Sequence, residues 1–158
     1  MSLLLIKKIK QALIEMFINA QMHGGCKFVF SSGQHYPQKY KLCFTIADIG
    51  ITVKDNVSRF LDKPVSGTAA VEWAVEHNHT TRTIATGVPG GLGLSLLRDF
   101  VSKNEGRMQI VSADGYWEQS GSKITTAALV GEFPGTVVNL EFNLADTSRY
   151  CLVEELKR

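Results

Sequence analysis

The sequence predicts a single domain of the α+β class, and three observations lead to this prediction. Apolar residues recur every three or four positions from about residue 4 to 22, which is the spacing of an amphipathic helix. Apolar and polar residues alternate over 41–48 and 137–142, as in strands with one buried face. A length of 158 residues with 44% hydrophobic and 20% charged residues suits one core and is too short for two ordinary domains.

Composition excludes several kinds of function. The net charge is +2 and the Lys and Arg residues are scattered, so nothing indicates nucleic-acid binding. The apolar run over 1–6 is too short to span a membrane and lysines follow it directly. Three cysteines without a CxxC spacing predict neither a zinc site nor a disulfide framework. We expect Cys26 and Cys43 to be reduced thiols in the core, and such thiols indicate a cytoplasmic location.

The first helix is expected from residue 4 to 22 and ends at the glycine pair that follows. Glu15 and Asn19 are four residues apart and share one helical face, and His23 extends the same row. One interpretation is an ordinary solvated face. The other is a functional row, because large apolar neighbours leave little room for a broad polar face: Ile14, Met16, Phe17 and Ile18. Residues 1–3 match a vector scar, and the abrupt start predicts a fragment without its upstream element.

The next elements are predicted as a hairpin that ends in a carboxylate. Strands are expected over 26–30 and 39–47, with a turn region over 31–38 between them. Asp48 shares the face of Leu42, Phe44 and Ile46, where a carboxylate is costly to bury without hydrogen-bond donors. Gly50 would allow a flat ligand to approach the backbone. The simpler interpretation is an Asp that caps a strand-to-loop turn.

The remaining chain is predicted to alternate between helices and strands. We expect helices from 53 to about 60 and from 67 to 77, a lid or insertion region over 61–88, and an apolar helix from about 92 to 104. Strands are expected over 107–112, 123–130 and 137–142, with turns at 114–115 and 134–135. The polar tail from residue 146 is expected to fray.

A glycine-rich turn opens the apolar helix. Gly90, Gly91 and Gly93 would leave backbone N–H groups free at the positive end of the helix dipole, which is a cradle for phosphate. No Gly-Lys-Ser/Thr follows, so this is not a Walker A loop, and the βαβ context of a dinucleotide fingerprint is missing. Helix packing explains such glycines equally well.

Taken together and in order, these features resemble the histidine-kinase-like ATPase superfamily (GHKL, the Bergerat fold). The superfamily includes sensor kinases, DNA gyrase B subunits, mismatch-repair ATPases and heat-shock chaperones. Residues 15–23 are similar to its N box, 48–52 to its first glycine box and 90–97 to its second, and the resemblance covers about 4–144. It implies a two-layer α/β sandwich whose mixed, mostly antiparallel sheet is covered on one face by helices.

The resemblance also implies roles for individual residues. Glu15 would be the catalytic base, Asn19 would coordinate Mg²⁺ through an amide oxygen, and Asp48 would accept from the adenine amino group of ATP. The full set of implied nucleotide contacts is Asn19, His23, Asp48, Gly50, Thr52, Gly90, Gly91, Leu92, Gly93 and Leu94. Three residues depart from the motifs, since Thr52 and Pro89 stand where glycines are usual and Met22 replaces a basic residue.

The implied function is a Mg·ATP-binding catalytic domain. It would transfer the γ-phosphate to a His or Ser of a partner protein or upstream domain, in the manner of a sensor histidine kinase or an anti-sigma-factor-like Ser kinase, or it would hydrolyse ATP. The departures from the motifs support an alternative, a nucleotide-gated interaction module with little or no turnover. An exposed sheet edge would favour a homodimer.

Overall fold

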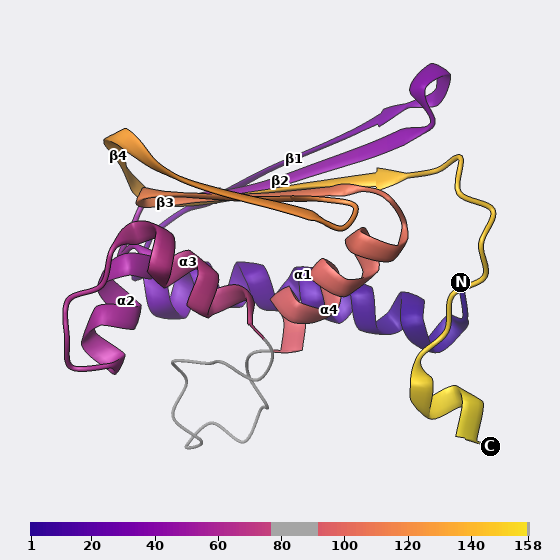
Figure 1. Cartoon of the computed structure of the whole chain (residues 1–158), viewed down its shortest axis with the longest axis horizontal. Helices are drawn as coiled ribbons and strands as arrows, with labels where there is room; N and C mark the ends of the chain where they lie inside the picture. Colours follow the sequence, from indigo (N-terminus) through magenta and orange to yellow (C-terminus); the bar gives the residue numbers. More distant parts are fainter. Residues whose placement is uncertain (77–91, 158) are drawn as a thin grey trace.

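The described residues of the computed structural model are 1–76 and 92–157, and they form an antiparallel sheet with helices over one face (Figure 1). The strand order is β1-β2-β4-β3. The helices are α1 (Leu3–Gly24), α2 (Val53–Phe60), α3 (Gly67–Val75) and α4 (Leu92–Lys103), with short 3₁₀ turns η1 (Pro37–Lys39) and η3 (Val153–Lys157). The strands are β1 (Val29–Tyr36), β2 (Lys41–Asp48), β3 (Arg107–Ser120) and β4 (Lys123–Asn143). The α+β prediction is confirmed, with antiparallel pairing at every strand junction in this sheet.

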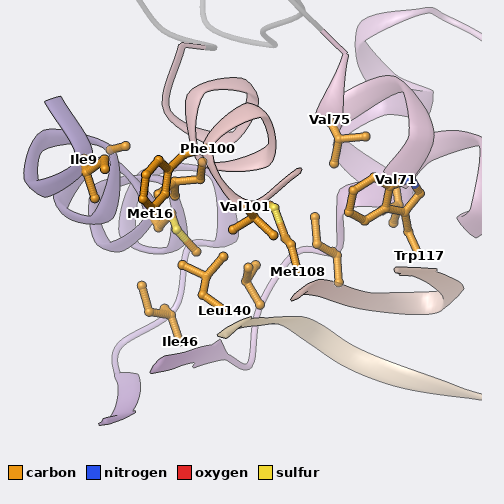
Figure 2. Packing of buried hydrophobic residues seen from close by; sticks show 14 of the residues in the cluster. Ile9, Met16, Ile46, Val71, Val75, Phe100, Val101, Met108, Trp117 and Leu140 are labelled. Atoms are coloured by element: carbon orange, nitrogen blue, oxygen red, sulfur yellow. The ribbon is translucent and has the colours of Figure 1, made fainter. Parts of the chain in front are cut away.

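The core lies between the helices and the inner face of the sheet (Figure 2). α1 contributes Ile9 and Met16, α4 contributes Phe100 and Val101, and the sheet contributes apolar residues from β2, β3 and β4. The largest fully buried side chain is Trp117 of β3, next to α3. Burial of these side chains removes apolar surface from water and fixes α1 and α4 side by side on the sheet.

The long hairpin β3–β4 corrects two turn predictions. Asp114-Gly115 lies in a bulge of β3, and Pro134-Gly135 lies inside β4, which continues for 21 residues. Both dipeptides favour turns locally, but β3 and β4 are paired on both sides of them, and β4 also pairs with β2 over 136–143. Pro134 and Gly135 fall in a register shift of β4, between the pairs Ser112–Thr136 and Ala113–Phe133, so the missing N–H of proline costs no ladder bond. β1 likewise runs on to Tyr36 through part of the expected turn region.

The C-terminal tail is held against the domain, so the expectation that it frays is wrong. Asn104, buried at the end of α4, donates to the Asn143 carbonyl at 2.9 Å and to Asp146 Oδ2 at 3.0 Å. Tyr150 packs edge-on against Phe100 and bonds to the Asp146 carboxylate. Ser2, the N-cap of α1, donates to Glu155 Oε2 at 2.7 Å, so α1 and the tail support each other.

The expectation that Cys26 and Cys43 are core thiols is wrong, and the structure also shows how exposed the side chains of α1 are. Ile14 and Ile18 point to solvent, while Glu15 and Asn19 are partly buried on the flank of α1. Cys26 and Cys43 are only partly buried, because Cys26 precedes β1 and Cys43 lies on the outer face of the sheet. No helix among the described residues is long and apolar enough to cross a membrane.

Candidate functional site

Glu15 of α1 lies directly against the first turn of α4. A Cβ built on Gly93 would lie 2.6 Å from Glu15 Oε2 and 3.4 Å from Glu15 Cβ, so the missing side chain leaves the space that the carboxylate occupies. Asn19 lies one helical turn further along α1 and is partly buried. α1, which carries Glu15 and Asn19, therefore packs against the start of α4 at Glu15.

Asp48 occupies the end of β2 on the face that the helices cover. It is opposite Val29 of β1 and Thr136 of β4, and it is only 6% exposed. Its Oδ1 atom is buried and has no hydrogen-bond partner among the described residues. Burial raises the pKa of this carboxyl above its ordinary value, and the backbone N–H of Thr136 opposes the shift in part. An unpaired acceptor in the interior indicates a place for a ligand donor.

The segment after Asp48 is held tightly by β4. The Gly50 N–H donates to the Pro134 carbonyl at 3.1 Å. A Cβ on Gly135 would lie 2.1 Å from the Asp48 carbonyl oxygen, so glycine is required for the two strands to approach this closely. Thr52 is the N-cap of α2, where its hydroxyl accepts from the Asp55 N–H and donates to Asp55 Oδ2 at 2.7 Å. The residue that departs from the glycine motif thus caps a helix.

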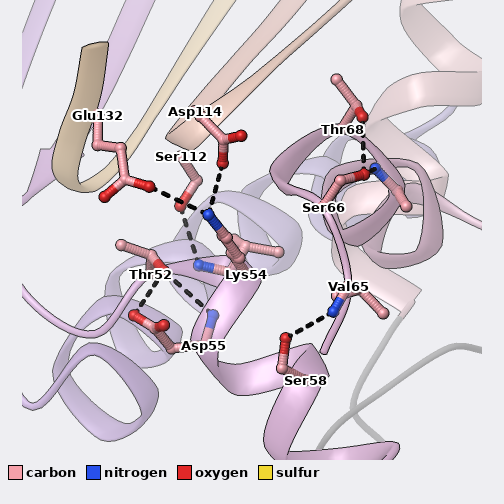
Figure 3. A network of polar contacts seen from close by, with 12 residues as sticks. Thr52, Lys54, Asp55, Ser58, Val65, Ser66, Thr68, Ser112, Asp114 and Glu132 are labelled. Carbon is pink, nitrogen blue, oxygen red and sulfur yellow. Dashed lines mark hydrogen bonds and ion pairs between the residues drawn. The ribbon is translucent and has the colours of Figure 1, made fainter. Parts of the chain in front are cut away.

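A polar network fixes the start of α2 to the sheet (Figure 3). The Val53 N–H donates to Ser112 Oγ of β3 at 2.9 Å, and Ser112 is completely buried. Lys54 forms ion pairs with Asp114 at 2.9 Å and with Glu132 at 3.0 Å. The backbone that leaves Asp48 is consequently anchored at both ends, by β4 near Gly50 and by β3 at Val53.

Cys26 links α1 to Asp48. Its thiol donates to the Ala20 carbonyl at 2.9 Å, in the last turn of α1. Burial raises the pKa of this thiol, and the negative charge of Asp48 raises it further. Cys26 is therefore bonded to the C-terminal part of α1 and lies close enough to the carboxylate at the end of β2 to feel its charge.

Other predicted contacts are less well defined. Gly90 and Gly91 lie outside the described residues, as does the part of the predicted lid from residue 77 to 88, and the side chains of His23 and Leu92 are not described. Leu94 is partly buried and packs on the core. No group of three or more His, Cys, Asp or Glu side chains suited to a metal occurs within 1–76 and 92–157.

Sequence reasoning missed the residues that support Asp48. Ser112 and Gly135 are ordinary members of strand sequences, and their importance comes from contacts with segments far away in the chain. Of these two residues only Gly135 was noted in the sequence, and there it was assigned to the turn predicted at 134–135.

This architecture is known. It matches the 43K ATPase domain of Thermus thermophilus gyrase B, solved in complex with an aminocoumarin, with a TM-score of 0.50 and 15% sequence identity. The chain has the Bergerat fold. The match covers 94% of this chain and 37% of the gyrase chain, so this chain spans little more than a third of that protein's length. No family model matches the sequence, and no curated protein matches it.

Proposed function

We propose that this chain is an ATP-binding domain of the GHKL type. The observation that carries the proposal is the buried, unpaired Oδ1 of Asp48 on the helix-covered face of the sheet. A buried acceptor without a donor is destabilising in the free protein, and a ligand N–H would remove that penalty. The 6-amino group of adenine is such a donor, and the Bergerat fold of the chain supports the same ligand.

The phosphates would lie toward the start of α4. The N-terminus of a helix favours anions, and Gly93 lacks a side chain at this end. Asn19 offers an amide oxygen, a ligand type that Mg²⁺ accepts, so Asn19 would hold the ion that accompanies ATP. When bound, Mg²⁺ would neutralise phosphate charge during transfer.

Glu15 is the residue that we propose as the base. Its carboxylate lies over Gly93 at the start of α4, where the phosphates would bind and an attacking hydroxyl or water would need to lose a proton. We propose phosphoryl transfer to a His or Ser of a partner protein, or hydrolysis of ATP, as the reaction. Replacing Glu15 by Gln keeps the size of the side chain and removes the base, so turnover should fall about 100-fold while nucleotide affinity is retained.

A second candidate function is a nucleotide-gated interaction module with little turnover. The position of Thr52 favours this module. Threonine lacks the backbone conformational freedom of glycine, and its hydroxyl caps α2, so the segment after Asp48 is more rigid. Measurable phosphate release that disappears in Glu15→Gln would argue for the enzyme. Nucleotide binding without release, unchanged in Glu15→Gln, would argue for the module.

The adenine site itself is tested with a matched pair of carboxylate variants. Asp48→Asn removes the negative charge and exchanges one of the two acceptor oxygens for a donor, whereas Glu72→Gln makes the same chemical change at an exposed position on α3. We expect affinity for ADP to fall at least tenfold in Asp48→Asn and to stay unchanged in Glu72→Gln. Equal affinity of the two variants would disprove the placement of adenine at Asp48.

A further inference from the structure

β1 is an edge strand whose free side is open to pairing. It stands at one end of the strand order, pairs with β2, and has no strand on its other side within 1–76 and 92–157. Every residue of β1 after Val29 is exposed, and the β1–β2 hairpin extends away from the layer of helices (Figure 1). A free edge of this kind presents a row of unpaired N–H and C=O groups, to which another strand can bind.

The sequence of β1 lacks the features that usually prevent edge strands from pairing. Natural edge strands carry charged residues or proline, or are very short. β1 has eight residues, and none of them is Asp, Glu, Lys, Arg or Pro. The strand at the other end of the order, β3, contains Arg107, Asp114 and Glu118. Of the two end strands, β1 is therefore the one without charged residues that would oppose pairing.

Exposed aromatic rings lie along this edge, on the face of the sheet that the helices leave uncovered. Val29 is opposite Asp48 and shares the helix-covered face, so the next residue, Phe30, points to the other face. Phe28 precedes β1 in the same alternation, and Tyr36 ends the strand on the same face as Phe30. Phe28 is 72% exposed and Phe30 is 58% exposed. Covering these rings would remove a large apolar surface from water.

The order of side chains on this face makes β1 complementary to itself. Rings stand at both ends and small or polar side chains in the middle: Phe28, Phe30, Ser32, Gln34 and Tyr36. In antiparallel pairing with a second copy about a two-fold axis at Ser32, each Phe28 lies opposite the partner's Tyr36. Pairing over 28–36 would form about eight to ten main-chain hydrogen bonds, as many as a standard protein interface contains.

We propose that the free edge of β1 is a homodimer interface, in which two copies pair antiparallel about a two-fold axis at Ser32 and join their sheets into one. The occupant is a second copy because one short strand supplies both complementary ends, Phe28 and Tyr36, and no charge on it opposes self-pairing. This assigns the homodimer expected from the sequence to one edge of the sheet. The interface contains none of the residues proposed to bind ATP, so it is tested without nucleotide.

Sedimentation equilibrium of the full chain over a range of concentrations measures the dimer dissociation constant. We expect the wild-type chain to be in a monomer–dimer equilibrium. Ser32→Lys places two like charges directly opposite each other at the axis, and the dissociation constant should rise about tenfold or more. Ser122→Lys is the matched control, because it makes the same change in the exposed turn between β3 and β4. The control should dimerise like the wild type.

A mixing experiment separates charge repulsion from a folding defect. Ser32→Glu should weaken the dimer as Ser32→Lys does, because two carboxylates then meet at the axis. In an equimolar mixture of the two variants, Lys of one copy lies opposite Glu of the other, and dimers should form again with about the wild-type affinity. A variant that had lost its fold could not recover in this way.

Each outcome decides the inference. A wild-type chain that is monomeric at every concentration would overturn it, as would a dimer that Ser32→Lys does not weaken or a mixture that fails to restore dimers. An edge that binds an extended segment of another protein instead would give the first of these results. All of these results leave the proposed ATP site untouched, and a chain that dimerises as predicted but binds no ATP would disprove only the proposed function.

Discussion

Gly135 of β4 lies against the backbone of Asp48 of β2 with no room for a side chain, and Gly135→Ala tests what this close approach contributes. A Cβ at residue 135 would lie 2.1 Å from the Asp48 carbonyl oxygen, 2.8 Å from its carbonyl carbon and 2.9 Å from Ile49 Cα. These are backbone atoms, so no flexible side chain can move aside. The two strands would have to separate by about 1 Å for ordinary contact.

The expected cost follows from the contacts that this separation breaks. Overpacking of this kind costs about 1–3 kcal/mol. The hydrogen bonds from Gly50 N–H to Pro134 and from Ser112 to Gly135 would each lose about 0.5–1.5 kcal/mol as they lengthen from 3.1 Å and 2.7 Å. We therefore expect Gly135→Ala to lower the free energy of unfolding by about 2–6 kcal/mol and Tm by about 4–24 °C.

Urea denaturation followed by circular dichroism measures this change. Gly131→Ala is the matched control, because it lies in the same strand and a Cβ there meets nothing within 4 Å. The control should stay within about 0.5 kcal/mol of the wild type. If Gly135→Ala and Gly131→Ala have the same denaturation midpoint, β4 does not hold the Asp48 segment in the way described.

Three further predictions address the site and the tail. Gly93→Ala should change the free energy of unfolding by less than about 1 kcal/mol, because the flexible end of Glu15 can move aside. The displaced carboxylate should reduce phosphate release about 100-fold. Release at the wild-type rate would contradict the role of Glu15. Burial raises the folded-state pKa of Asp48 above its ordinary 3.8, so the stability of the wild type falls as pH rises through the folded pKa. Asp48→Asn should therefore make the ligand-free protein more stable than the wild type at pH 7. In urea titrations this gain in stability should shrink toward pH 4. Asn104→Ala should cost about 2–3 kcal/mol and expose the tail to limited proteolysis after residue 144, whereas an unchanged cleavage pattern would show that the tail is held by other contacts.

Much of the fold was predictable because its elements have clear local patterns. The three- and four-residue spacing in α1 and the alternation in β2 predicted the first helix and the strand that ends at Asp48. The helix-facing position of Asp48 followed from the same alternation, and the structure confirms it. These predictions needed no information from distant parts of the chain.

The failures arose where distant contacts override local preference. Asp114-Gly115 and Pro134-Gly135 are common turn sequences, but the long pairing of β3 with β4 and the approach of Gly135 to Asp48 keep both inside strands. The tail is polar and has no periodicity, so only its bonds to Asn104 and Ser2 show that it is ordered.

The candidate site was predictable only in part, for a related reason. Motif spacing pointed to Glu15, Asn19, Asp48 and Gly93, and the structure places Glu15 against Gly93. Ser112 could not be distinguished from other serines, because its three hydrogen bonds involve α2 and β4, which are distant in sequence. The nucleotide roles of Glu15, Asn19, Asp48 and Gly93 stay predictions.

The central claim is that this chain binds adenine nucleotides through Asp48, and calorimetric titration of a non-hydrolysable ATP analogue tests it most directly. The titration is made with and without Mg²⁺, on the wild-type chain and on Asp48→Asn. We expect saturable binding that Mg²⁺ strengthens and that Asp48→Asn weakens at least tenfold. Heat changes that show no saturation in the wild-type chain, or that are identical in Asp48→Asn, would contradict the account.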